Sequence, residues 1–428
     1  MMEGVWMRTL HLGVAVAVSL SLAVPTGWTG DTDPRLSLPA LIEEALRVNP
    51  DIRASRIRWE SAKAKIPLSG AWAAPKIGVK FEEIPKGSVK FNQATIMYQL
   101  IQSIPFPGKL SARKQVAVKE AQVASMAFKQ TEWDIVSQLK AVYYDLFLLD
   151  RELEIEREQV VWLRQAVQTA NAGYATGHSA QTELLQAQRA LLEASNQIGV
   201  LEHRRQAMAA HLNHVLNRPA HELAGSPGPI RLDGVAYTPE ELVLIAGEAQ
   251  PELLAFKYTV ERAAASVKLS KRELLPDLET MTELRDPAMG PIGPWDLTLA
   301  IAIPFWFWTK WQYGVKVAIR DHESAQAAYE AMQNEIARRI HEHWHEAQAA
   351  YQTAKLSQDG LIPLSKQVVV SAMAAYHSGQ GALSELLDAL QQQAEQRRIY
   401  AQQLIALEQH VVMLEQATGI PLRERNLP

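Results

Sequence analysis

Tyr174-Ala175-Thr176-Gly177, followed by Glu183-Leu184-Leu185, returns in the second half of this chain as Tyr376-His377-Ser378-Gly379, followed by Glu385-Leu386-Leu387. Two earlier landmarks recur in the same order. Asn49-Pro50-Asp51-Ile52 returns as Gln250-Pro251-Glu252-Leu253, and Ser103-Ile104-Pro105-Phe106 returns as Ala302-Ile303-Pro304-Phe305. The 428-residue chain is therefore a tandem duplication. Each copy is a large module, far longer than the solenoid repeats of roughly 20–50 residues.

The duplication sets the expected domain organisation. We expect a first structural repeat over 37–218, a linker over 219–239 that is rich in Pro and Gly, a second structural repeat over 240–420, and a C-terminal tail over 421–428.

The N-terminus is typical of a secretory signal peptide over residues 1–23. Arg8 and His11 precede an apolar run from Leu12 to Val24, and Ser21-Leu22-Ala23 offers small residues for cleavage. The run is shorter than the roughly 20 apolar residues of a transmembrane helix. The alternative is a disordered tail behind a misplaced start codon.

Composition excludes several classes of function. The net charge of −4 gives no reason to expect nucleic-acid binding. Cysteine is absent, which excludes disulfides, Cys-based metal sites and a thiol nucleophile.

Each repeat contains the pattern of two amphipathic strands. In the first, Ile77, Val79 and Phe81 alternate with polar residues, and a second alternating run ends at Ile104. In the second, alternate positions from Trp295 to Ile303 are apolar. We expect strands within about 76–104 and 277–303.

A very long helical stretch follows each pair of strands. Lys109 to Ala172 and Val315 to Asp359 contain no Gly and no Pro. Sixty helical residues would extend roughly 90 Å. Each stretch leads to a Gly-containing turn and a returning helix with apolar spacing near 3.5, as in coiled coils. The expected helical hairpins cover about 109–217 and 312–418.

Four strands cannot close a transmembrane barrel, which needs at least eight. Open sheet edges in lipid leave backbone groups unsatisfied. If the strands cross a membrane, several copies must share one barrel, and three copies would supply twelve strands. The predicted fold class is mostly α: long helical hairpins plus four amphipathic strands per chain, assembled as a trimeric twelve-stranded β-barrel and an α-helical tunnel.

Aromatic side chains lie at both ends of the last predicted strand. Because Trp prefers membrane–water interfaces, we expect interface positions for Trp295, Trp306, Trp308 and Trp311. The alternative is a buried soluble core around these residues.

The chain resembles the TolC family of outer-membrane efflux proteins. The resemblance rests on Leu41-Ile42-Glu43-Glu44-Ala45-Leu46 with Asn49-Pro50, on Pro105-Phe106-Pro107-Gly108, on the paired Tyr-x-x-Gly turns and on the Glu-Leu-Leu segments. It covers essentially the whole chain after the signal peptide. It implies a homotrimeric, non-enzymatic channel in the outer membrane with its helical part in the periplasm. The implied partners are a periplasmic adaptor and an inner-membrane efflux pump. The Pro-Phe-Pro-Gly-Lys segment favours the heavy-metal branch that includes CzcC and CusC.

The resemblance also assigns candidate site residues. The helical turns would form the periplasmic tip that contacts the adaptor, with Tyr174, Gly177, His178 and Ser179 in one turn and Tyr376, Gly379, Gln380 and Gly381 in the other. The alternative is that these are turn residues only. Some members carry an Arg where Gly381 stands, and that Arg pairs with carboxylates to hold the pore shut. A latch of that kind is in doubt here.

Carboxylates follow each turn. Glu385 and Asp388 share one helix face, and Glu183 has the equivalent place in the first repeat. Three copies would arrange these three residues as a pore constriction, in which rings of negative charge favour cations. The alternative is a solvated helix face.

His341-Glu342-His343-Trp344-His345-Glu346 contains the spacing of a zinc metalloprotease motif, with His341 and His345 on one helix face. The segment lies inside a much longer helix and has no evident third ligand, so we expect a polar helix face. The sequence predicts no metal site, no cofactor and no catalytic residues. A helical metalloprotease and a periplasmic coiled-coil structural or adaptor protein without a barrel are the alternative functions.

Overall fold

The computed structural model describes residues 36–82, 94–177, 179–222, 225–285, 295–302 and 311–423. The predicted signal peptide, His178, Trp306, Trp308 and the tail beyond Arg423 lie outside the described residues. For Trp311 the backbone is described and the side chain is not.

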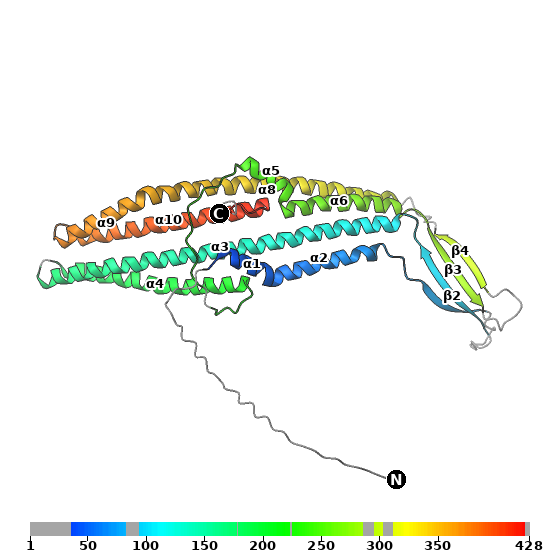
Figure 1. The fold of residues 1–428 in the computed structure, drawn as a ribbon, viewed down its shortest axis with the longest axis horizontal. Helices are drawn as coiled ribbons and strands as arrows, with labels where there is room; N and C mark the ends of the chain where they lie inside the picture. Colours follow the sequence, from blue (N-terminus) through cyan, green and yellow to red (C-terminus); the bar gives the residue numbers. More distant parts are fainter. Residues whose placement is uncertain are drawn as a thin grey trace, which may run out of the picture.

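The elements follow the duplication closely (Figure 1). The first repeat comprises α1 (Leu38–Val48), α2 (Pro50–Ser69), β1 (Lys76–Glu82), β2 (Thr95–Ile104), α3 (Lys109–Ala175) and α4 (Gln181–Val215). The second comprises α5 (Pro239–Ala249), α6 (Pro251–Arg272), β3 (Asp277–Arg285), β4 (Trp295–Ala302), η3 (Trp311–Val315), α8 (Lys316–Leu356), η4 (Ser357–Leu361), α9 (Ile362–His377) and α10 (Leu383–Thr418).

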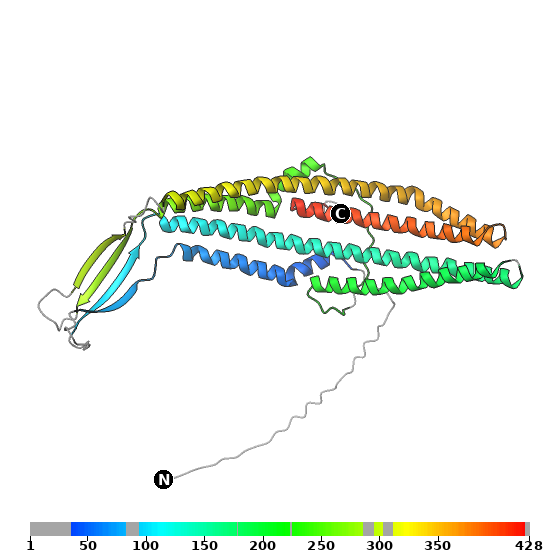
Figure 2. The ribbon, with the colours of Figure 1, turned by 180° about the vertical axis from the view of Figure 1, so that it is seen from behind.

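The helices form an elongated layer with the sheet at one end and both helical turns at the other (Figures 1 and 2). Helices α2 and α4 pack end to end along one side of α3, while α6 and α10 pack along its other side. Helix α8 lies beyond α6 and α10. The layer therefore has two free edges, one formed by α2 and α4 and the other by α8 and α9. Among the described residues, none of the helices has the length and apolarity needed to cross a membrane.

The four strands form one antiparallel sheet in the order β1-β2-β3-β4. Val79 pairs with Tyr98, Tyr98 with Leu284, and Leu284 with Trp295, so the pairing of β2 with β3 joins the hairpins of the two repeats. One face exposes a set of large apolar side chains: Ile77, Val79, Phe81, Tyr98, Leu100, Leu284, Trp295, Leu297, Leu299 and Ile301. The other face carries polar groups, and Gln99 donates a hydrogen bond to Glu283 there.

The first repeated landmark has a capping role. Asn49 accepts hydrogen bonds from the first turn of α2 through its side chain and donates one to the carbonyl of Val215, and Gln250 accepts one from the backbone N–H of Leu253 at the start of α6. Proline follows each cap, where its missing N–H costs nothing.

The sheet is fastened to the helices by a buried ammonium group. Lys109, only 3% exposed, donates to the carbonyl of Leu275 at 2.6 Å and to the carboxylate of Asp277 at 2.7 Å. Arg272 donates to the carbonyl of Gly108 at 2.7 Å. These contacts hold the end of β2 and the start of β3 at a fixed position relative to the helical layer.

The second long helix departs from α-geometry. Trp311–Val315 and Ser357–Leu361 are π-helical, whereas the equivalent helix of the first repeat, α3, is one α-helix of 67 residues. Pro363 cannot donate to the preceding turn, and a π-bulge is one way to accommodate such an interruption.

Residues 225–237, named the belt here, cross the helical layer on one face. The Tyr143 hydroxyl accepts from the N–H of Gly228 at 3.0 Å, and the indole N–H of Trp344 donates to the carbonyl of Tyr237 at 2.8 Å. Arg423 donates to the carbonyl of Gly234. The belt is thereby tied to α3, to α8 and to the C-terminal segment.

Candidate functional site

The two helical turns lie side by side at the end of the layer opposite the sheet (Figures 1 and 2). Gly177 and Gly379 adopt φ of +73° and +71°, in the left-handed region where glycine carries no steric penalty. Their N–H groups donate to the carbonyls of Tyr174 and Tyr376, each at 3.1 Å. The duplicated motif thus gives the same chain reversal twice.

The two turns close tightly by complementary small residues. A Cβ on Gly173 would lie 2.5 Å from the hydroxyl oxygen of Ser179. In the second turn the equivalent positions are Ala375 and Gly381, and a Cβ on Gly381 would lie 3.0 Å from the Cβ of Ala375. Glycine at one position of each pair therefore avoids a close contact with its partner. An Arg side chain at Gly381 does not fit this turn unless the backbone shifts.

Tyr174 and Tyr376 have the same place in the motif and different surroundings. Tyr174 is 46% exposed, whereas Tyr376 is 7% exposed and packs in the cluster that joins α3, α4, α9 and α10. Burial raises the pKa of the Tyr376 hydroxyl, and the nearby carboxylate of Glu183 raises it further. The hydroxyl has no hydrogen-bond partner among the described residues. The structure therefore brings Glu183 of the first hairpin close to Tyr376 of the second.

The predicted carboxylates occupy the first turns of the returning helices. Glu183 lies in the first turn of α4 and Glu385 in the first turn of α10, while Asp388 follows one turn later. Glu385 and Asp388 are exposed, and neither makes an ion pair with another described residue. Their charges are therefore available to a solute or to a neighbouring copy.

A contact that the sequence did not indicate links the hairpins near the turns. The hydroxyl of Thr169 on α3 lies 3.1 Å from the ring nitrogen Nδ1 of His377 on α9. Thr169 and His377 share no motif, so only the packing of the two hairpins reveals the pair.

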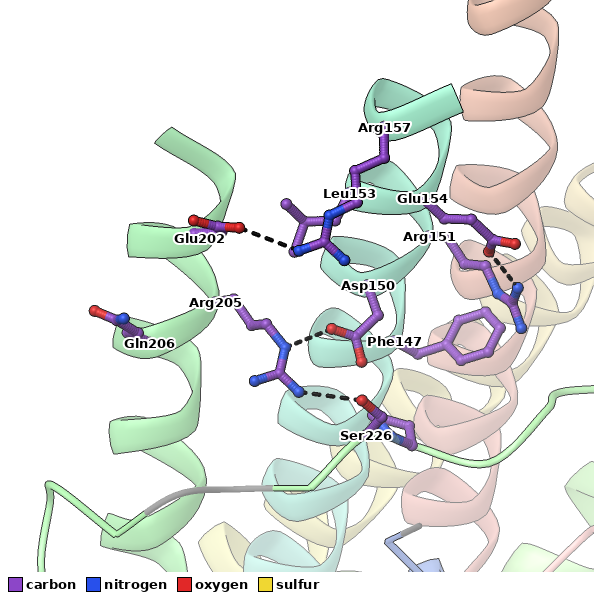
Figure 3. Close-up of a pocket in the computed structure, with 11 residues that line it drawn as sticks. Phe147, Asp150, Arg151, Leu153, Glu154, Arg157, Glu202, Arg205, Gln206 and Ser226 are labelled. Atoms are coloured by element: carbon purple, nitrogen blue, oxygen red, sulfur yellow. Dashed lines mark hydrogen bonds and ion pairs between the residues drawn. The ribbon is translucent and has the colours of Figure 1, made fainter. Parts of the chain in front are cut away.

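The cavity in Figure 3 lies where α3, α4 and the belt meet, and its volume is about 500 Å³. Arg205 donates to Asp150 at 2.5 Å and to the hydroxyl of Ser226 at 3.2 Å. Two further ion pairs, Arg157 with Glu202 and Arg151 with Glu154, also line the cavity. The charged groups pair with one another, so this cavity anchors the belt.

In the histidine-rich segment His341 and His345 are exposed, as on a polar helix face. His343 lies between them and meets α10, where its ring centroid lies 5.6 Å from that of His410. Burial, and then the charge of His410, lower the pKa of His343. Within the described part of the chain, no group of three or more His, Cys, Asp or Glu side chains is arranged to hold a metal ion.

Of the predicted interface aromatics, Trp295 is the one whose side chain is described. It is 62% exposed and begins the row that continues with Leu297, Leu299 and Ile301. A single copy of the chain therefore leaves this apolar face of the sheet exposed.

The family model of outer membrane efflux proteins matches residues 41–218 and 244–420. The chain belongs to the outer membrane efflux protein family, and it is the outer-membrane channel component of an efflux system. The match decides between a channel and the periplasmic adaptor considered above.

Two curated relatives span most of the chain. The outer membrane efflux protein BepC of Brucella suis is 21% identical, covering 81% of this chain and 77% of its own. The probable outer membrane lipoprotein SilC of Salmonella typhimurium is 22% identical, covering 70% and 68%. Among solved structures, CusC is 17% identical with a TM-score of 0.78, covering 94% of this chain and 96% of its own. The predicted fold class of helical hairpins with four strands per chain is confirmed.

Proposed function

We propose that three copies of this chain close into one passive conduit, with a shared twelve-stranded barrel in the outer membrane and a helical tunnel in the periplasm. The observation that carries this proposal is that the sheet and the helical layer each end in two unpaired edges, which lie on the same two sides of the chain. The sheet ends at β1 and β4, and the helical layer ends at α2 with α4 and at α8 with α9. β1 adjoins α2, and β4 adjoins η3 and α8. If the β4 and α8–α9 edges of one copy contact the β1 and α2–α4 edges of the next, the same rotation between copies closes both the barrel and the tunnel.

Apolar side chains on the two helical edges support this assembly. On α4, Leu185 and Leu192 are 55% and 71% exposed and lie seven residues apart, a heptad spacing. On α9, Leu364 and Val368 are 59% and 53% exposed and lie on one helix face. Pairing the two stripes would bury surfaces that a single copy leaves in water.

The turns form the periplasmic tip in this proposal. Tyr174, Gly177, His178, Ser179, Tyr376, Gly379, Gln380 and Gly381 would present the surface that meets a periplasmic adaptor, which in turn connects to an inner-membrane pump. The pump supplies the energy, so the conduit itself needs no catalytic group. Residues 1–23 would direct export as a cleaved signal peptide. Trp295, Trp306, Trp308 and Trp311 would lie at the membrane interfaces.

Glu183, Glu385 and Asp388 would form the constriction in this assembly. Three copies would bring nine carboxylates to one narrow level, where negative charge attracts cations. Because Glu385 and Asp388 have no described cationic partner, their charge is not neutralised within the protomer. A metal cation is therefore the favoured substrate class, in line with the heavy-metal branch.

The assembly is tested by its oligomeric state and its conductance. Protein extracted from outer membranes should run as a trimer before heating and as a monomer afterwards, and it should form ohmic channels in a planar bilayer. A monomer in the soluble periplasmic fraction would refute the proposal.

The constriction is tested by ion selectivity. Replacing Glu385→Gln together with Asp388→Asn should lower the cation-to-anion permeability ratio several-fold, because six of the nine charges disappear from the trimer. The control replaces Glu240→Gln and Glu248→Gln, two exposed carboxylates of α5 far from the tip. An unchanged ratio in the first variant would remove these residues from the constriction.

A further inference from the structure

A cationic groove lies between the first turns of α3 and the last turns of α6. Its volume is about 600 Å³, and its lining includes Ala112, Ala264 and Ala265 as a small apolar floor. Four cations border it: Lys119, Lys268, Lys271 and Arg272. Glu261 is the single acidic lining residue.

The positive charge of this groove is only partly compensated. Lys119 pairs with Glu261 at 2.6 Å, which neutralises one cation. Lys268 and Lys271 are exposed, and neither makes an ion pair with a carboxylate in the part of the chain that the structure describes. Arg272 donates from Nη1 to the carbonyl of Gly108, and a guanidinium has further donors. In a chain of net charge −4, the groove therefore carries a local excess of positive charge.

The groove lies at the end of the helical layer that adjoins the sheet. Helix α3 begins at Lys109 and rises about 1.5 Å per residue, so Ser111 and Gln115 lie within roughly 10 Å of its start. On the other wall, Lys271 and Arg272 precede β3, which begins at Asp277. The headgroup layer extends about 5–8 Å beyond the hydrocarbon on each side of a bilayer. If the apolar sheet face fills the hydrocarbon, the groove lies at the level of the inner-leaflet headgroups.

The groove opens on the face of the helical layer that carries the belt. Buried residues of α3 such as Leu139, Leu146 and Leu153 repeat every seven positions, so a shift of five heptads, roughly 35 residues, returns to the same face of the helix. This shift carries Gln115 and Lys119 to Asp150 and Glu154, which line the cavity of Figure 3 together with Ser226 and Pro227 of the belt. A belt inside the tunnel would obstruct it, so the belt face is the outer face. Lipid can therefore reach the groove.

We propose that this groove binds the phosphate headgroup of an anionic phospholipid from the inner leaflet of the outer membrane. Lys268 and Lys271 donate to the phosphate oxygens, Arg272 contributes its free N–H groups, and Ala112, the lining alanine nearest the sheet, packs against the glycerol. The bound headgroup would fix the height of the channel in the membrane. This inference rests on the proposed function, since it needs the sheet to span the membrane.

The test uses the purified trimer, with native mass spectrometry and titration of phosphatidylglycerol or phosphatidylcholine. The wild type should retain phosphatidylglycerol in preference to phosphatidylcholine. In Lys268→Gln/Lys271→Gln, affinity for phosphatidylglycerol should fall roughly thirtyfold, because each of the two cations near a lipid surface contributes on the order of 1 kcal/mol. Lys355→Gln/Lys366→Gln, two exposed lysines nearer the tip, is the matched control and should bind as the wild type does.

Three results would overturn the inference: no preference for phosphatidylglycerol in the wild type, equal binding in the groove variant, or displacement of the lipid by inorganic phosphate at equal concentration. The last would assign the groove to free phosphate. Trimer formation and conductance are measured on the same samples. A conducting wild-type trimer without lipid preference refutes only the groove, whereas a non-conducting monomer refutes the proposed function.

Discussion

At the scale of single residues, the two turns reach one geometry with different side chains. Gly173 faces Ser179 in the first turn, and Ala375 faces Gly381 in the second. The sequence predicted both reversals, because the Tyr-x-x-Gly motif places a glycine where φ is positive. It could not predict the proximity of Tyr376 to Glu183 or of Thr169 to His377, because those contacts depend on how two separate hairpins pack.

This complementarity predicts a non-additive pair of substitutions. Gly173→Ala should destabilise the first turn by about 1–3 kcal/mol, since the new methyl group overlaps the Ser179 hydroxyl. Adding Ser179→Gly should restore most of the loss, because the pair then matches Ala375 with Gly381. Protease cleavage within the turn would measure local opening, with Ser179→Gly alone as the control. Additive effects of the two substitutions would contradict the predicted overlap.

At the scale of elements, the sequence predicted the strands and long helices well, because alternation and freedom from Gly and Pro are local signals. The π-helical segment Ser357–Leu361 was not predicted, because Gly360 and Pro363 indicate an interrupted helix without specifying the geometry of the interruption. The buried charges of α10 were also beyond prediction. Glu408 and Glu415 are 4% and 2% exposed and pair with Arg423 and Lys140, partners that only the packed structure brings near.

The Glu408 pair predicts a pH-dependent effect on stability. Burial raises the pKa of Glu408, and the guanidinium of Arg423 opposes that rise. Arg423→Ala should therefore raise the folded pKa of Glu408 further above its ordinary value. A charged, buried carboxylate then destabilises the fold at neutral pH by about 3–5 kcal/mol. This cost should diminish as the pH falls through the raised pKa, because the folded state then binds a proton.

The measurement is the difference in thermal midpoint between wild type and Arg423→Ala in detergent at pH 7.5 and at pH 5. The control is Arg320→Ala, which removes an exposed ion pair with Glu323 and should cost at most about 1 kcal/mol at either pH. A larger deficit for Arg423→Ala at pH 5 than at pH 7.5 would contradict the assigned cause.

At the scale of the whole molecule, each of the two repeats supplies two strands and one helical hairpin, and neither repeat can close a barrel or a tunnel alone. The family and the fold class were predictable from the order of landmarks, because each landmark marks a cap, a junction or a turn. The cationic groove was not predictable from the sequence, since its walls come from α3 and α6, which are distant in the chain and meet only in the folded layer.

The proposed contact between copies predicts a specific cross-link. The natural chain has no cysteine, so any disulfide in a variant comes from the introduced pair. Leu192 on α4 and Val368 on α9 lie at similar distances along the helices from the two turns. Leu192→Cys combined with Val368→Cys, or with Leu364→Cys one turn away, should give covalent trimers under mild oxidation.

Each single cysteine variant is the control and should yield no covalent trimer, although two copies could join by chance collision. Denaturing electrophoresis without reducing agent measures the products. If neither double variant gives trimers while both still form channels, the helical edges do not meet as proposed.

The complementary turns also constrain the history of this chain. If both turns descend from one ancestral hairpin, a step through Ala opposite Ser would create a close contact that the side chains or the turn must relieve. A route through glycine at both positions avoids that contact. Each tip therefore keeps the same reversal with a different pair of residues, so one turn can change its surface without a matching change in the other.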